Sequence, residues 1–273
     1  MNHIAEAFAA LRAQGRTALM PYLTIGYPSL EATLELVPAL VAGGADFVEL
    51  GIPFSDPLAD GATIQQATHV ALQQGVTVET CLETVRRLRE DGIETPLILM
   101  SYYNPVFQRG LAAFCRVAAA AGADGLIVPD LPPEEALELR GGCQANGLDL
   151  IFLLAPTSTQ ERVRMVARMA TGFIYLISLT GVTGARHRLP PDLEAFVARV
   201  RAVTDMPLAV GFGVGNPEQA RRVAAVADGV IVGSAIVRLA GEADRPVEAV
   251  RRFVGSLREG LDRPYPRGDF CVL

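Results

Sequence analysis

Short apolar runs alternate along the chain with longer segments in which apolar residues recur every three or four positions. The short runs are typical of buried strands, and the longer segments of amphipathic helices. Strands are predicted at residues 19–25, 46–50, 97–101, 125–128, 148–154, 173–178, 208–210 and 229–232. Helices are predicted at residues 30–42, 63–74, 77–91, 110–121, 133–146, 160–169, 193–203 and 217–225. Strand and helix therefore alternate along most of the chain.

This alternation predicts an α/β fold, a (β/α)8 or TIM barrel of eight parallel strands. The 273 residues fit one such barrel, which typically takes about 250 residues. Because no Pro/Ser-rich linker divides the sequence, a single domain is expected over residues 1–273. Extra helices are predicted at 4–14 and 247–259, before the first strand and after the last. A doubly wound open sheet is the alternative.

Two carboxylates mark the segment 47–65. Glu49 lies within an apolar strand pattern, where an ionised side chain is rare, and Asp60 lies in the Pro-rich loop that follows. In a barrel, both would lie near the C-terminal ends of the strands, where active sites form. This arrangement indicates acid–base chemistry. A structural ion pair for Glu49 and a turn or helix cap for Asp60 remain open.

Composition excludes several classes of partner. The net charge of −6 and the pI near 5.2 provide no basic surface for nucleic acid or an anionic membrane. The N-terminal segment lacks the apolar core of a secretory signal, and no apolar run is long enough to span a membrane. A cytoplasmic protein is therefore expected. The three histidines, His3, His69 and His187, have no metal-binding spacing, so no metal is expected.

All 24 basic side chains are arginine, and lysine is absent. Without lysine the chain cannot form an imine with a carbonyl substrate, anchor pyridoxal phosphate or build a Walker-type loop. Carbon–carbon cleavage through a lysine imine is therefore excluded.

Three glycine-rich segments follow the last three predicted strands, at residues 180–186, 211–215 and 233–235, and the last of them is predicted to open a helix. Glycines let backbone amides approach an anion, and loops after strands seven and eight of a barrel commonly bind phosphate. Each segment alone is more typical of a tight turn than of a phosphate site. Together they favour a phosphate site. The segment 211–215 lacks the Gly-x-Gly-x-x-Gly fingerprint, so no nicotinamide cofactor is expected.

Five motifs occur in order: FVELGIPFSDPLADG at 47–61, YYNP at 102–105, GVTG at 181–184, GFGV at 211–214 and GSAIV at 233–237. With these motifs the chain closely resembles the tryptophan synthase alpha subunit family. The resemblance implies retro-aldol cleavage of indole-3-glycerol phosphate to indole and D-glyceraldehyde 3-phosphate, without any cofactor. It also implies a pyridoxal-phosphate beta subunit that receives the indole, in an alpha2beta2 tetramer.

The resemblance implies a role for each site residue. Glu49 would protonate indole C3 and remove the side-chain hydroxyl proton, and Asp60 would stabilise charge at the indole N–H. Thr183 would close over Asp60. The remaining contacts with substrate would come from Tyr22, Met100, Tyr175, Gly184, Phe212, Gly213, Gly233 and Ser234.

Some assignments stay open. Direct contact with substrate and packing at the rim are both possible for Tyr22, Met100, Tyr102 and Asp130. The family usually has proline where this chain has Ala62, so a more mobile Asp60 loop is expected. The rival functions are a free-standing indole-3-glycerol phosphate lyase, a non-catalytic sensor or activator of a partner, and another phosphate-binding barrel such as a sugar-phosphate isomerase.

Overall fold

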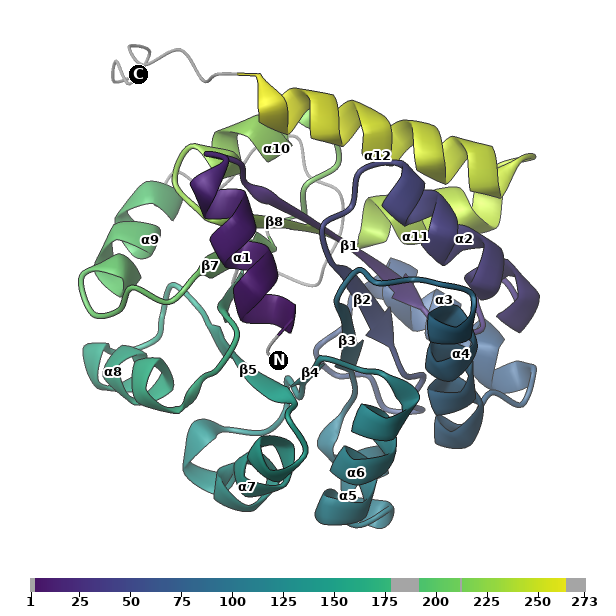
Figure 1. Ribbon diagram of the computed structural model, residues 1–273, viewed down its shortest axis with the longest axis horizontal. Helices are drawn as coiled ribbons and strands as arrows, with labels where there is room; N and C mark the ends of the chain where they lie inside the picture. Colours follow the sequence, from purple (N-terminus) through teal and green to yellow (C-terminus); the bar gives the residue numbers. More distant parts are fainter. Residues whose placement is uncertain (1–2, 178–191, 212, 264–273) are drawn as a thin grey trace.

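Eight parallel strands close into one barrel in the computed structural model, which describes residues 3–177, 192–211 and 213–263 (Figure 1). Each strand pairs with the next along the chain, and β8 pairs with β1. The predicted barrel is therefore confirmed, and the open sheet is wrong. The strands are β1 Ala18–Thr24, β2 Val48–Gly51, β3 Leu97–Met100, β4 Gly125–Ile127, β5 Asp149–Leu154, β6 Ile174–Ile177, β7 Leu208–Gly211 and β8 Gly229–Val232.

Helices surround the barrel (Figure 1). They are α1 His3–Ala13, α2 Leu30–Ala42, α3 Ala62–Gln73, α4 Val78–Glu90, α5 Tyr103–Gln108, α6 Leu111–Ala121, α7 Leu137–Ala145, α8 Gln160–Met169, α9 Leu193–Arg201, α10 Pro217–Ala224, α11 Ser234–Glu242 and α12 Pro246–Asp262. The extra helices predicted before β1 and after β8 are α1 and α12. Two details differ from the sequence pattern. The short helix α5 was not predicted, and residues 133–146 divide into a 3-10 turn, η1 Pro133–Glu135, and α7.

Helix α1 covers one end of the barrel, over the starts of the strands (Figure 1). Its Phe8 ring lies 4.7 Å from the Phe47 ring and 5.8 Å from the Phe173 ring, measured between centroids. These aromatic residues join a fully apolar layer inside the barrel. Six strands contribute to it, together with Phe47 and Phe173 just before β2 and β6: Ala18, Met20, Phe47, Ile98, Ile127, Ile151, Phe173, Ala209 and Ile231. A dry, closed end cannot bind a polar substrate. The chemistry must lie toward the opposite end.

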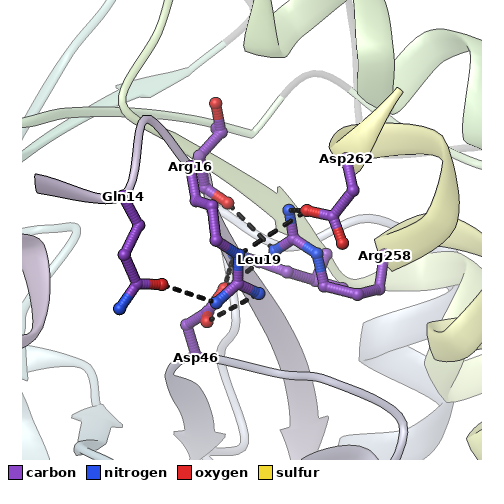
Figure 2. A network of polar contacts seen from close by, with 7 residues as sticks. Gln14, Arg16, Leu19, Asp46, Arg258 and Asp262 are labelled. Atoms are coloured by element: carbon purple, nitrogen blue, oxygen red, sulfur yellow. Dashed lines mark hydrogen bonds and ion pairs between the residues drawn. The ribbon is translucent and has the colours of Figure 1, made fainter. Parts of the chain in front are cut away.

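The same closed end carries a network of charges that holds α12 against the barrel (Figure 2). Arg258 is buried on α12, and its guanidinium donates 3.0 Å hydrogen bonds to the Asp46 carboxylate and to the Thr17 carbonyl. Asp46 also accepts a 2.8 Å hydrogen bond from the Leu19 amide at the start of β1. The last helix is thereby fastened to the first two strands.

Candidate active site

Two positions beyond the apolar layer, three strands carry a polar residue and β3 carries Met100. Because side chains alternate between the faces of a strand, the residues at i and i+2 both point into the barrel. Met20, Phe47, Ile98 and Phe173 are thus followed on the same face by Tyr22, Glu49, Met100 and Tyr175. Tyr22 and Glu49 are paired in register across β1 and β2. A layer with a carboxyl group and two phenols therefore lies above the apolar plug.

Glu49 is buried without a hydrogen-bond partner. Its side chain is 1% exposed, and Oε1 contacts no donor among the described residues. Burial alone raises the pKa of its carboxyl to about 8. An ion pair for Glu49 is absent from the described part of the chain. Glu49 is therefore a neutral acid at pH 7, as a general acid needs to be.

Asp60 lies in the loop between β2 and α3 and is 7% exposed. Its Oδ2 accepts a 3.1 Å hydrogen bond from the Tyr102 hydroxyl. Burial raises the pKa of the Asp60 carboxyl to about 6, and the hydrogen bond from Tyr102 opposes that rise. The N-cap of α3 is Gly61, so Asp60 does not cap that helix. Near pH 7 the Asp60 carboxyl is mostly ionised while that of Glu49 keeps its proton.

Two strand glycines make room for the two phenols. A Cβ built on Gly51 of β2 would lie 2.0 Å from the Tyr22 hydroxyl, and one on Gly211 of β7 would lie 2.6 Å from the Tyr175 hydroxyl. Each ring therefore leans from its own strand over the next one. Burial raises the pKa of both phenols, and the carboxylates of Glu49 and Asp60 raise it further. The two phenols are thus near both carboxyl groups.

The first residues of α11 border this layer. Gly233 is the N-cap of α11, and Ser234 is the first helical residue. A Cβ built on Gly233 would lie 3.7 Å from Cβ of Tyr22, so the helix begins beside the buried phenols. The first turn carries no acidic residue, and the amides of Ser234 and Ala235 have no acceptor within the helix, whereas those of Ile236 and Val237 donate to the Gly233 carbonyl. This helix start can attract an anion.

The remaining predicted residues divide into three groups. Met100 is half-buried, in register with Gly51, and contacts the cluster around Tyr22. Gly213 has φ +65°, which glycine adopts without strain. The other three predictions, for Thr183, Gly184 and Phe212, lie outside the described residues.

Tyr102 and Asp130 have structural partners that the sequence left open. The Tyr102 hydroxyl joins Asp60 to its own loop, because it also accepts a 2.9 Å hydrogen bond from the Ala59 amide. Asp130 Oδ1 accepts a 2.8 Å hydrogen bond from the Tyr103 amide at the start of α5. Tyr102 is therefore a positioning residue for Asp60, and Asp130 caps a helix. The contact between Tyr102 and Asp60 joins residues 42 positions apart.

No group of three or more His, Cys, Asp or Glu side chains within 3–177, 192–211 and 213–263 is arranged to hold a metal ion. No described helix is both long enough and apolar enough to cross a membrane.

Comparison with known proteins gives a consistent result along almost the whole chain. The family model described as tryptophan synthase alpha chain matches residues 8–261. The chain is 55% identical to the tryptophan synthase alpha chain of Roseiflexus sp. (strain RS-1), over 94% of this chain and 100% of that protein. Identity to the alpha chain of Dehalococcoides mccartyi is 52%, over 96% of this chain and 100% of that one.

Solved structures agree with the sequence comparison. The tryptophan synthase subunit alpha of Legionella pneumophila superposes with a TM-score of 0.90 at 42% identity, covering 96% of this chain and 99% of that one. A chain of Mycobacterium tuberculosis tryptophan synthase superposes with a TM-score of 0.89 at 41% identity, covering 96% and 98%. The chain therefore belongs to the tryptophan synthase alpha chain family.

Proposed function

We propose that Glu49 and Asp60 divide the acid–base work of a retro-aldol cleavage of indole-3-glycerol phosphate. As a member of its family the protein is a carbon–carbon lyase of tryptophan biosynthesis, and the products are indole and D-glyceraldehyde 3-phosphate. The observation that carries the division of roles is the difference between the two carboxyl groups. The pKa of Glu49 is raised to about 8 and that of Asp60 to about 6. One acid and one base therefore coexist near pH 7.

The reaction needs an electron sink before the carbon–carbon bond can break. Protonated Glu49 donates its proton to indole C3, which turns the ring into an indolenine cation. The Asp60 carboxylate stabilises the positive charge at the ring nitrogen. Glu49, now ionised, removes the proton of the hydroxyl next to the breaking bond. The bond electrons return to the ring, the aldehyde leaves, and Glu49 regains its proton.

The rest of the layer suits a flat substrate with an anionic tail. Tyr22, Met100 and Tyr175 line the apolar part of the proposed slot, and Phe212 is the further aromatic wall expected from sequence. The amides of Gly233 and Ser234 at the start of α11 are the proposed phosphate site. Gly213 and Gly184 are expected to support the phosphate site, and Thr183 to close over Asp60.

Members of this family work with a beta subunit. We propose an alpha2beta2 tetramer in the cytoplasm, with the beta subunit over the mouth of the barrel. Two large apolar side chains support this surface, because Leu58 is 92% exposed on the Asp60 loop and Phe107 is 56% exposed on α5. The two segments touch, since the Phe54 and Tyr102 rings lie 5.4 Å apart. Exposed apolar residues beside a loop that carries Asp60 suit a protein partner that receives indole.

An indole-release assay tests the proposed activity. The full chain is incubated with indole-3-glycerol phosphate, alone and with a beta subunit, and indole and glyceraldehyde 3-phosphate are measured together. Equal amounts of both products, formed faster with the beta subunit, are expected. Fast release that the beta subunit does not change would favour the free-standing lyase. Release of neither product would contradict the proposal and favour the sensor, or the isomerase if sugar phosphates are interconverted.

A further inference from the structure

The two buried phenols differ in the residue that follows them on the same strand face. Two positions after Tyr22 is Thr24, which has a hydroxyl, whereas two positions after Tyr175 is Ile177, which has none. The Tyr22 hydroxyl lies 3.3 Å from Oγ1 of Thr24, within hydrogen-bonding distance. Thr24 is 1% exposed, so water does not compete for this contact. The Tyr22 hydroxyl therefore has a partner that β6 does not offer to Tyr175.

The Tyr22 ring reaches over β2, the strand that carries Glu49. It occupies the space above Gly51, where any larger residue would put its Cβ. Glu49 precedes Gly51 by two positions on β2, so its side chain points into the barrel from the same face. Thr24 and Gly51 are paired in register, two residues beyond the pair of Tyr22 and Glu49. The hydroxyl thus lies within hydrogen-bonding distance of Thr24 and over the strand whose Glu49 carboxyl lacks a donor among the described residues.

We propose that Thr24 is a positioning residue for the reaction, which holds the Tyr22 hydroxyl away from Glu49 and so leaves that carboxyl without a phenol donor. This role deepens the proposed function and rests on it. In the buried site an unpaired hydroxyl costs free energy. If Thr24 no longer bound it, the Tyr22 hydroxyl would need another acceptor, and Oε1 of Glu49 is a buried acceptor on the adjacent strand that has no partner among the described residues.

The titratable groups around Glu49 come from three segments: Tyr22 on β1, Tyr175 on β6 and Asp60 after β2. The facing residues of β3 are Ile98 and Met100, which do not titrate. A donor to an ionised carboxylate lowers its pKa. A phenol that turned to Glu49 would therefore weaken it as the acid that protonates indole C3.

Four variants of the full chain test this role: Thr24→Val, Thr24→Ser, Tyr22→Phe, and Thr24→Val combined with Tyr22→Phe. Valine keeps the shape of threonine without the hydroxyl, and serine keeps the hydroxyl. Two quantities are measured against pH. One is kcat/KM for indole release, and the other is the 13C NMR signal of the Glu49 carboxyl, identified by its loss in Glu49→Gln.

Thr24→Val is expected to move the Glu49 titration, and the alkaline limb of kcat/KM, to lower pH by about one unit. Above that pH, kcat/KM then falls about tenfold relative to the parent. Thr24→Ser should keep the parent profile, and the double variant should match Tyr22→Phe. An unchanged Glu49 titration in Thr24→Val, or the same shift in the double variant, would overturn the role of Thr24. The NMR titration reports on Thr24 even if Glu49→Gln retains full turnover, an outcome that would contradict the proposed function alone.

Discussion

The Tyr102 hydroxyl positions the Asp60 side chain and favours its ionised form. The Tyr102 hydroxyl donates to the Asp60 carboxylate at 3.1 Å and accepts from the Ala59 amide at 2.9 Å, so it fixes both the side chain and the loop. The same bond opposes the effect of burial on the pKa of Asp60. At the scale of the residue, the neighbours of each carboxyl group decide which one holds the proton.

Tyr102→Phe should therefore raise the pKa of Asp60 above its present value of about 6, because the opposing hydrogen bond is lost. The ionised form of Asp60 would then appear only at higher pH, so the acid limb of kcat/KM should move upward. Below neutral pH a loss of about tenfold is expected. The measurement is the pH profile of indole release. Tyr103→Phe, on the neighbouring residue, is the control and should leave the acid limb in place.

Glu49 also makes stability depend on pH. In the folded chain it keeps its proton up to about pH 8, whereas the unfolded chain releases it near the ordinary pKa of 4.5. Between these values the unfolded state binds fewer protons, so the free energy of unfolding falls as pH rises. Glu49→Gln lacks this fall and should be more stable than the parent at pH 8, by on the order of a few kcal/mol.

Urea unfolding at several pH values measures this difference. The two proteins should differ little near pH 4 and diverge as the pH rises through the window from 4.5 to about 8. Asp46 and Asp60 titrate in both proteins, so their contributions cancel in the comparison. Parallel stability curves would mean that the Glu49 carboxyl is not held neutral by burial.

At the scale of the element, one buried guanidinium joins α12 to the segments just before β1 and β2. Arg258→Ala leaves the Asp46 carboxylate without its closest cation and the Thr17 carbonyl without that donor. Removal of one partner from a buried pair is expected to lower the free energy of unfolding by about 3 kcal/mol or more. Arg263→Ala removes an exposed pair with Glu259 from the same helix end and should cost less than about 1 kcal/mol. Urea unfolding compares them, and equal losses would contradict a special role for Arg258.

Most strands and helices could be predicted from the sequence. The period of apolar residues predicted all eight strands and the alternating helices, because each strand of a parallel barrel is buried on both faces. Helix α5 was not predicted, because Tyr103–Gln108 is short, contains Pro105 and gives no periodic pattern of apolar residues. The break between η1 and α7 falls at Ala136, which has high helix propensity and no breaker character.

Only part of the site could be predicted from the sequence, because several roles depend on contacts between strands. Glu49 stands out as a carboxylate in a strand, and its lack of a partner among the described residues confirms that it is no ion pair there. The roles of Tyr102, Thr24 and Gly51 depend on which strands become neighbours. Thr24 had a local signal, since it follows Tyr22 by two positions on one strand face. Gly51 had none, because a strand glycine does not reveal which side chain fills its space.

At the scale of the whole molecule, the two ends of the barrel have opposite characters. One end is closed by α1 and by the Arg258 network, and the other has Glu49, Asp60, exposed Leu58 and exposed Phe107. The stabilising network and the proposed active site are thereby separated along the barrel axis, as in other proteins of this architecture. That Ala62 softens the Asp60 loop stays a prediction. Ala62 is the first residue of α3, where alanine is also a good helix former.

Leu58→Asp and Phe107→Asp test the proposed beta-subunit surface. Each puts a charge on an exposed apolar position and should reduce the stimulation of indole release by the beta subunit about tenfold or more, with little effect on the chain alone. Ala13→Asp adds the same charge at the closed end and is the matched control. The measurement is indole release as the beta subunit is titrated. Normal stimulation of both variants would exclude this surface.

The central claim is that neutral, buried Glu49 transfers the proton that allows the carbon–carbon bond to break. The most direct test is the pH profile of kcat/KM for indole release by the parent and by Glu49→Gln. The parent should give a bell with limbs near pH 6 and pH 8, set by Asp60 and Glu49. Glu49→Gln should lose at least about 100-fold in kcat/KM, and the limb near pH 8 should disappear. Turnover close to that of the parent, or a limb that persists in the variant, would contradict the account.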